Sequence, residues 1–317
     1  MRLEHIFDHG VAMDIFGALK WARSEVVKTT TDMYTKLCCS QSYGSFERCG
    51  VCAAIYVEHG DIAEHGQFPF IGWIHPGFED EPVPLVIEAH NFRCVATLIS
   101  PLYALTHVNC ARQMKPNDSV VYYDVIYKED KDEANAQKAV VLGVINLSAS
   151  MDPRIGDIYD LALIEVADVF GYTGILNRLE SPYPALPIRI AAGDPFLTNT
   201  QYTAYTIGYG KSAVRDTLTY HRTAFHSDDV CQLIWKKFYD GTICATAADG
   251  SSLLRREDDG AALVVVKDNV VKDNGPTLVG IGFVNIDWYG ESLTGYIRVS
   301  NFCDQIAKYT SGAVVCE

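Results

Sequence analysis

The chain has 317 residues, of which 48% are apolar and 21% are charged. This composition is typical of a folded globular protein and excludes disorder over most of the length. The formal net charge of -14 at pH 7 repels phosphate backbones and anionic membrane surfaces, so we expect soluble protein partners and no nucleic acid. The apolar runs, such as residues 261–266, are far shorter than the ~20 residues of a membrane-spanning helix, so no such span is predicted.

The first 37 residues carry apolar side chains at helical spacing, which predicts a short docking helix or a poorly ordered extension. A secretory signal would need a continuous apolar core here, but Asp8, Asp14 and Lys20 interrupt it. Ten cysteines are nevertheless many for a reducing compartment, and their even number suits five disulfides. We therefore predict an extracellular, secreted protein whose signal peptide is not visible in this sequence.

Four cysteines then follow within residues 38–56, which predicts a small disulfide-stapled linker. Zinc binding is the alternative, because Cys49 and Cys52 have the CxxC spacing of a zinc ribbon. No second CxxC or HxxxH pair follows, so disulfides are favoured and no metal is expected. The four cysteines of this linker are Cys38, Cys39, Cys49 and Cys52.

From residue 57 onward the pattern changes to short runs of β type with turn-forming residues between them. Such spacing predicts an all-β sandwich or a pair of barrels. The one helix expected in this part covers residues 301–309. The clearest predicted strands are residues 120–127, 139–146, 161–166, 202–209, 263–267 and 277–284.

Two features fall in predicted loops of this part. The charged stretch from Glu129 to Glu133 offers oxygen ligands that suit calcium. Its lysines would compete with the ion, so a solvated loop is favoured and calcium is the weaker alternative. Asn117 and Asn146 each begin an Asn-x-Ser sequon, which makes both candidates for glycosylation in a secreted protein.

Several segments resemble, in the same order, motifs of the trypsin and chymotrypsin family of serine proteases. The resemblance covers residues 57–317 and implies two six-stranded antiparallel β-barrels with a C-terminal α-helix, preceded by the cysteine-rich extension 1–56. The matching segments are AEHGQFPF (63–70, beside AxxGQFPW), CVATLISP (94–101, beside CGGTLISP), LTHVNC (105–110, beside LTAAHC), DLALI (160–164, beside DIALL), GYG (208–210, beside GWG) and YIRVSN (296–301, beside YTRVSN).

The resemblance places altered residues at the catalytic triad, which needs a hydroxyl nucleophile, an imidazole base and an orienting carboxylate. The segment EDDGAAL, residues 257–263, stands beside the family's GDSGGPL and puts Asp259 in place of the serine. Asn109 takes the place of the histidine, and an amide cannot act as a base near pH 7. Asp160 matches the carboxylate. His107 lies two residues before Asn109, and we expect it to point elsewhere.

Other positions of the implied active site depart from the family as well. Glu257 replaces a glycine whose N–H helps to bind the oxyanion, so we expect a misshapen oxyanion hole. Leu253 stands at the floor of the specificity pocket and excludes a preference for basic side chains. Phe283, Val284 and Asn285 replace the family's Ser-Trp-Gly at the edge that pairs with a peptide substrate.

The resemblance also implies two disulfides, Cys94 with Cys110 and Cys231 with Cys244. The first closes a short loop and contributes about 3 kcal/mol by loop-closure entropy. A third family bridge is absent because Arg255 replaces its first cysteine. The remaining six thiols allow 15 connectivities, and a bridge from the linker to the terminal helix would fasten the extension to the domain. These six are Cys38, Cys39, Cys49, Cys52, Cys303 and Cys316.

Activation by the family's usual cut is not expected. The segment that matches the family's mature start begins at Val57, and the nearest basic residue upstream is Arg48. Asp258 fills the position of the aspartate that pairs with the freed amine in the family. The domain is therefore predicted to stay a single chain.

Three hypotheses follow for function. The first is a non-catalytic serine protease homolog, resembling the masquerade-like proteins of arthropods, that binds proteins as a cofactor, adaptor or decoy in an extracellular proteolytic cascade such as those of innate immunity. The second keeps the family's serine-type endopeptidase activity in residual or unconventional form, and needs a hydroxyl such as Ser251 or Ser252. The third is a hydrolase that uses Asp259 and Asp160 as a carboxylate pair on a glycosidic bond.

Overall fold

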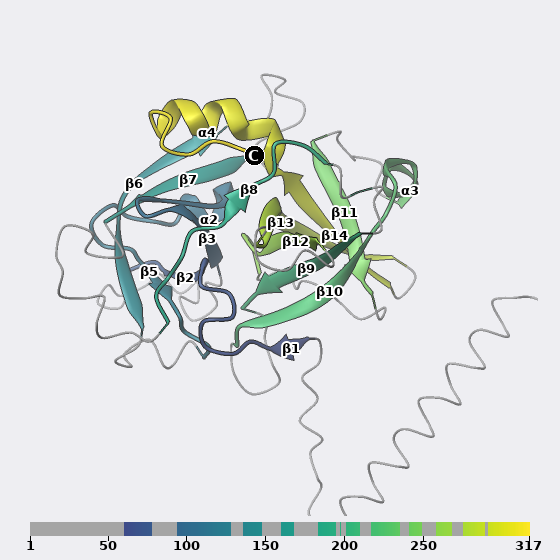
Figure 1. Ribbon diagram of the computed structural model, residues 1–317, viewed down its shortest axis with the longest axis horizontal. Helices are drawn as coiled ribbons and strands as arrows, with labels where there is room; N and C mark the ends of the chain where they lie inside the picture. Colours follow the sequence, from purple (N-terminus) through teal and green to yellow (C-terminus); the bar gives the residue numbers. More distant parts are fainter. Residues whose placement is uncertain are drawn as a thin grey trace, which may run out of the picture. The chain divides into compact units, whose positions relative to one another are not determined.

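The computed structural model describes residues 60–77, 94–127, 136–147, 160–167, 183–194, 197, 201–209, 217–234, 241–248, 258–267, 275–288 and 291–317 (Figure 1). All of them fall in one compact unit, Tyr56–Glu317. The predicted extension 1–56 and the candidate calcium loop from Glu129 to Glu133 lie outside the described residues.

The first half of the unit is a closed antiparallel barrel with the strand order β2-β3-β4-β7-β6-β5. Most residues of these strands are buried, as expected for a small barrel whose interior is filled by side chains. The strands are β2 (Ile71–His75), β3 (Cys94–Ser100), β4 (Tyr103–His107), β5 (Val120–Tyr123), β6 (Gln137–Leu147) and β7 (Leu161–Val166).

The second half is a six-stranded barrel that closes where β10 pairs with β9. Two short strands flank it: β1 (Asp61–Ile62) pairs with β10, and β8 (Arg189–Ile190) pairs in parallel with β13. The predicted fold of two six-stranded antiparallel barrels is confirmed. The strands of this barrel are β9 (Tyr202–Gly208), β10 (Thr219–Phe225), β11 (Thr242–Ala247), β12 (Ala262–Lys267), β13 (Thr277–Trp288) and β14 (Glu291–Arg298).

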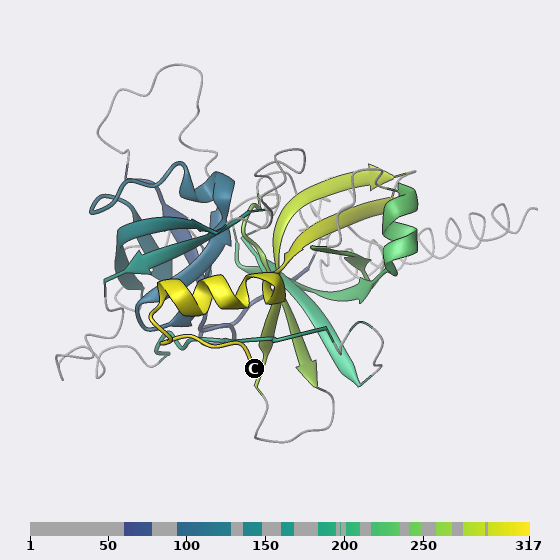
Figure 2. The same cartoon turned by 90° about the horizontal axis from the view of Figure 1, so that it is seen from above.

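Helices are short in the described residues. The helix α2 (Val108–Ala111) directly follows β4, and α3 (Asp228–Ile234) follows β10. At the end of β14 the chain enters a 3-10 turn, η6 (Val299–Phe302), and then α4 (Cys303–Tyr309), drawn in yellow in Figure 2. The predicted C-terminal helix is confirmed.

Strand ends differ from the predicted ones where the backbone changes conformation. The strand β7 has the predicted bounds, whereas β5 ends at Tyr123 and not at Tyr127. The reason is Asp124, whose φ of 57° is left-handed and cannot continue a strand. The strands β6 and β13 are longer than predicted, at residues 137–147 and 277–288.

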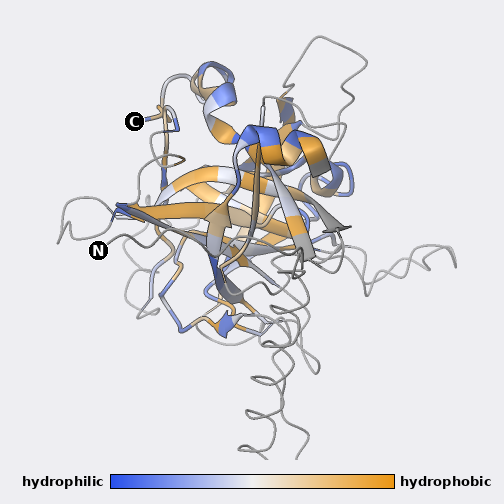
Figure 3. Cartoon of the chain, turned by 90° about the vertical axis from the view of Figure 1, so that its right-hand side faces the viewer, coloured by the Kyte–Doolittle hydropathy of each residue, from blue (hydrophilic) through white to orange (hydrophobic). Residues whose placement is uncertain are grey.

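One apolar core joins the two barrels. Its buried cluster contains Val95 and Leu105 of the first barrel together with Ile207 and Ile281 of the second. Figure 3 shows the matching concentration of hydrophobic residues in the strands. Burial of each such side chain stabilises the fold by about 1.5–3 kcal/mol, so the surface between the barrels is held as firmly as their interiors.

Three disulfides lie in the described residues. Two are the pairs Cys94–Cys110 and Cys231–Cys244 that the resemblance implies. The third joins Cys303 to Cys316. It forms because the chain reverses after α4 through Ser311 and Gly312, which have φ of 53° and 78°.

This third disulfide corrects the expected bridge from the linker to the terminal helix, since both C-terminal cysteines are used by one another. Only three connectivities then remain for the four linker cysteines. Within the described residues, no helix has the length and apolarity that a membrane crossing requires.

Candidate functional site

The loop that carries Asp259 lies where the two barrels meet. Asp259 forms a bridge with Cys94, and its carbonyl accepts a hydrogen bond of 3.1 Å from the backbone N–H of Val95 in β3. On the other side, the N–H of Gly260 donates to the carbonyl of Gly282 in β13 at 2.9 Å. The backbone around Asp259 is therefore fixed to one strand of each barrel.

Gly260 is required by this arrangement. Its φ is 90°, and a Cβ at this position would lie 2.3 Å from the carbonyl oxygen of Val95. Only glycine adopts this conformation without strain and permits so close an approach of two backbones. The GDSGG-like element thus retains a structural requirement at Gly260 although its central side chain is different.

His107 faces Asp259, so the expectation that it points elsewhere is wrong. Its Nδ1 lies 3.5 Å from Asp259 Oδ2. The side chain of His107 is 1% exposed and that of Asp259 is 28% exposed. The reason is non-local: His107 is the last residue of β4, and the pairing of the Asp259 loop with β3 brings the carboxylate over the end of that neighbouring strand.

Phe283 completes the buried side of this cluster. Its ring centroid lies 6.1 Å from that of His107, and the residue is only 8% exposed. Phe283 follows Gly282, whose N–H donates to the carbonyl of Ala261 at 2.7 Å. The imidazole of His107 and the phenyl ring of Phe283 are therefore neighbours in the buried part of this cluster.

The sequence comparison agrees with this architecture. Residues 65–306 match the model of the protein family Trypsin. The chain belongs to the trypsin family. No curated protein matches the sequence. In this trypsin-family domain, Asp259 lies in the loop that resembles the family's GDSGGPL segment, and its carboxylate is paired with His107.

The other two triad positions lie close to His107 in this trypsin-family domain. Asn109 is on α2 and partly exposed, and its carbonyl accepts a hydrogen bond from Gln113 Nε2 at 3.2 Å. Asp160 is partly exposed, and its carbonyl accepts one from the N–H of Val108 at 3.3 Å. The start of α2 therefore joins the end of β4 to the residue that precedes β7.

Asp258 lies inside the second barrel, with an exposed fraction of 4%. Burial raises the pKa of the Tyr296 hydroxyl, hydrogen bonds with Thr206 and Thr294 lower it, and the charge of Asp258 raises it by the smallest amount. The Tyr296 hydroxyl lies 2.6 Å from Thr206 Oγ1. Asp258 therefore has buried, polar surroundings, whereas the side chain of Asp259 is partly exposed.

Several predicted positions lie outside the described residues. These are the oxyanion position Glu257, the pocket position Leu253, and with them Arg255, Ser251, Ser252 and Val57. Val284 and Asn285 belong to β13, but their side chains are outside the described part. The glycosylation candidates Asn117 and Asn146 are both exposed.

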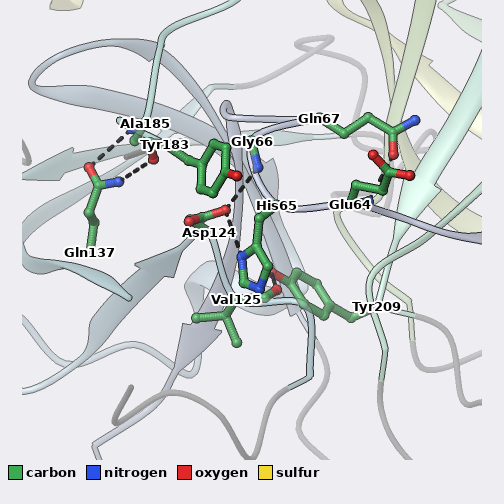
Figure 4. A network of polar contacts seen from close by, with 10 residues as sticks. All are labelled: Glu64, His65, Gly66, Gln67, Asp124, Val125, Gln137, Tyr183, Ala185 and Tyr209. Carbon is green, nitrogen blue, oxygen red and sulfur yellow. Dashed lines mark hydrogen bonds and ion pairs between the residues drawn. The ribbon is translucent and has the colours of Figure 1, made fainter. Parts of the chain in front are cut away.

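A second histidine–aspartate pair was not predicted from the sequence. His65 Nδ1 lies 3.2 Å from Asp124 Oδ1, which also accepts the N–H of Gly66 at 3.0 Å (Figure 4). Burial raises the pKa of Asp124, while the Gly66 hydrogen bond and His65 lower it. The sequence signal that could have pointed to this pair is Asp124 itself. It is an aspartate directly after an apolar strand, and its left-handed backbone ends that strand.

Metal ligands do not gather in the described residues. No group of three or more His, Cys, Asp or Glu side chains in this part of the chain is arranged to hold an ion. Neither His107 with Asp259 nor His65 with Asp124 has a third ligand of this kind beside it. Each pair brings an imidazole nitrogen close to a carboxylate oxygen, at 3.5 Å in the first and 3.2 Å in the second.

Proposed function

We propose that this trypsin-family protein is a non-catalytic homolog that acts by binding other proteins, as a cofactor, adaptor or decoy in an extracellular proteolytic cascade. The observation that carries the proposal is the pair of His107 and Asp259, with Nδ1 and Oδ2 3.5 Å apart and the imidazole 1% exposed. In the resemblance to the family, Asp259 takes the position of the nucleophile, and its imidazole neighbour is buried.

The chemistry of peptide cleavage does not fit these residues. Attack of the Asp259 carboxylate on a peptide would form a high-energy anhydride, and Asn109 has no titratable group near pH 7 to accept a proton. The side chain of His107 is 1% exposed, which leaves its imidazole little access to the leaving amine of a peptide. In the best-studied triad, loss of the unit lowers kcat about 10⁶-fold.

Localisation outside the cell is part of the proposal. Three disulfides in the described residues are typical of an oxidising compartment. The carboxylate-pair hypothesis gains no support, because the contact that Asp259 makes is with His107. The buried ring of Phe283 also lies beside the imidazole of His107.

Hydrolysis assays test the catalytic half of the proposal. The purified chain, before and after limited proteolysis, is incubated with casein and with small ester substrates. We expect no turnover above that of the Asp259→Ala variant. Turnover that Asp259→Ala abolishes would overturn the proposal.

A reconstituted cascade tests the binding half. The rate at which an active trypsin-family protease cleaves its protein substrate is measured with and without the chain. Asp259→Arg reverses the partly exposed charge of the cleft and should reduce any effect at least tenfold. Asp304→Arg, on the exposed side of α4, serves as the matched control. An equal loss in both variants would argue against the cleft as the binding surface.

A further inference from the structure

Residues 183–187, YPALP, form an exposed segment whose sequence restricts its backbone. Pro184 and Pro187 fix their own φ near -65°, and Tyr183 and Leu186, which precede them, are pushed toward extended conformations. Four of the five residues therefore favour the polyproline II region. We call residues 183–187 the proline ridge.

The burial pattern of the ridge has the period of a polyproline II helix. Ala185 is fully buried, and Ile188, three residues later, is 4% exposed. Between them the side chains point outward. Three residues per turn is the repeat of this helix, so the ridge keeps one row of side chains in the core and presents the other two rows to solvent.

Hydrogen bonds fasten the ridge to the first barrel. Gln137 of β6 donates from Nε2 to the carbonyl of Tyr183 at 2.8 Å, and its Oε1 accepts the N–H of Ala185 at 3.0 Å (Figure 4). The N–H of Leu186 donates to the carbonyl of Pro69 at 3.0 Å. A segment held in this way loses little conformational entropy on binding, which is the usual cost of ordering an extended ligand.

The outward side of the ridge is apolar. Tyr183 is 42% exposed and Leu186 is 52% exposed, and both prolines are exposed. The Tyr183 ring stacks on His65 with centroids 6.0 Å apart. It also lies over Gly66, where a Cβ would come within 2.6 Å of the ring. The ring thus packs against His65 and Gly66 at one end of the ridge.

We infer that the proline ridge is a docking element for a partner domain whose binding groove is lined by aromatic rings. The ridge offers two dipeptides, Tyr183-Pro184 and Leu186-Pro187, that repeat after three residues on the exposed side. Pro-x-x-Pro segments in this conformation dock into aromatic-lined grooves because their low-entropy helix is formed beforehand. The surface shares no residue with the cleft around Asp259, so this inference stands or falls separately from the proposed function.

Binding to recognition domains of known chemistry tests the inference. The full chain is immobilised, and purified SH3, WW and EVH1 domains, which have aromatic-lined grooves, are passed over it in surface plasmon resonance. We expect micromolar binding of at least one domain. The synthetic peptide of residues 181–189 should compete with it.

Variants identify the surface used. Pro184→Ala with Pro187→Ala should weaken binding at least tenfold. Leu186→Ala, which keeps every backbone donor, should weaken it about fivefold if the double variant proves unstable. Pro116→Ala, an exposed proline in another loop, should leave binding unchanged.

Three results would overturn the inference. They are no binding by any of the domains, equal binding by the ridge variants, and self-association of the chain in sedimentation that Leu186→Ala abolishes. The last result would assign the ridge to a second copy of the protein.

Discussion

Two histidine–aspartate pairs in the described residues have opposite burial. In the cleft, the imidazole of His107 is 1% exposed and the carboxylate of Asp259 is 28% exposed. At the other pair, the imidazole of His65 is 41% exposed and the carboxylate of Asp124 is 3% exposed. The same two side chains therefore serve different purposes. In the first pair a buried imidazole packs beside Phe283, whereas in the second a buried carboxylate anchors a surface histidine.

Substitution of the glycines beside the two pairs should produce the largest difference in the free energy of unfolding. Gly260→Ala should destabilise the domain by at least about 4 kcal/mol, because its φ of 90° is strained for alanine and the new Cβ would meet the backbone of Val95 at 2.3 Å. Denaturant unfolding monitored by circular dichroism measures this. Gly193→Ala, which has no heavy atom within 4 Å of its Cβ position, is the control and should change stability by less than about 1 kcal/mol.

Gly66→Ala sharpens the comparison, because its φ of 73° is also left-handed. The obstacle here is the ring of Tyr183, which is exposed and can move aside. The cost should therefore be smaller than at Gly260, about 1 to 3 kcal/mol. Equal losses at both glycines would show that the contact with Val95 adds nothing.

His107→Ala should cost about 2 to 4 kcal/mol in the free energy of unfolding. The change leaves a cavity beside Phe283 and takes the imidazole from Asp259. Asn109→Ala, at a partly exposed position of the neighbouring helix α2, should cost less than about 1 kcal/mol. Similar losses for the two variants would contradict the structural role of His107.

The pH dependence of stability should reveal Asp124. Burial raises its folded-state pKa above the ordinary value of 3.8, so the folded state binds the proton more tightly than the unfolded state. The stability that Asp124 contributes is present below the ordinary pKa and is lost as pH rises through the folded-state pKa.

Asp124→Asn cannot lose this stability, because the amide does not ionise and still accepts the hydrogen bond from Gly66. Relative to the wild type, the variant should gain about 1 kcal/mol between pH ~3 and pH ~7. Unfolding in urea across this range measures the gain. A variant that becomes less stable than the wild type as pH rises would show that His65 and Gly66 outweigh burial.

His65→Ala should have the smallest effect, below about 1 kcal/mol, since an exposed ion pair contributes little. Thermal unfolding measures the loss. A cost as large as that of His107→Ala would mean that burial does not distinguish the two pairs.

The sequence was sufficient for the fold. The apolar run of β7 and the cysteines at 94 and 110 are local signals, and the structure has the strand and the disulfide that they indicate. The end of β5 was predicted too far along the chain because apolar periodicity continues past Asp124, whereas the backbone turns there. Periodicity does not report a left-handed residue.

The contents of the cleft were harder to predict. The contact between His107 and Asp259 could not be predicted because 151 residues lie between them in the sequence. Their approach depends on the pairing of the Asp259 loop with β3. The proline ridge had a readable signal, the Pro-x-x-Pro spacing, but its exposure depends on how Ala185 and Ile188 enter the core.

Covalent labelling tests the central claim most directly. The purified chain is treated with a fluorophosphonate probe, which phosphonylates the activated serine of serine hydrolases with loss of fluoride, and is then digested and analysed by mass spectrometry. We predict no adduct on the peptide that contains Asp259, while an active trypsin-family protease in the same tube is fully labelled. An adduct on the chain that disappears in the Asp259→Ala variant would contradict the claim that this cleft is non-catalytic.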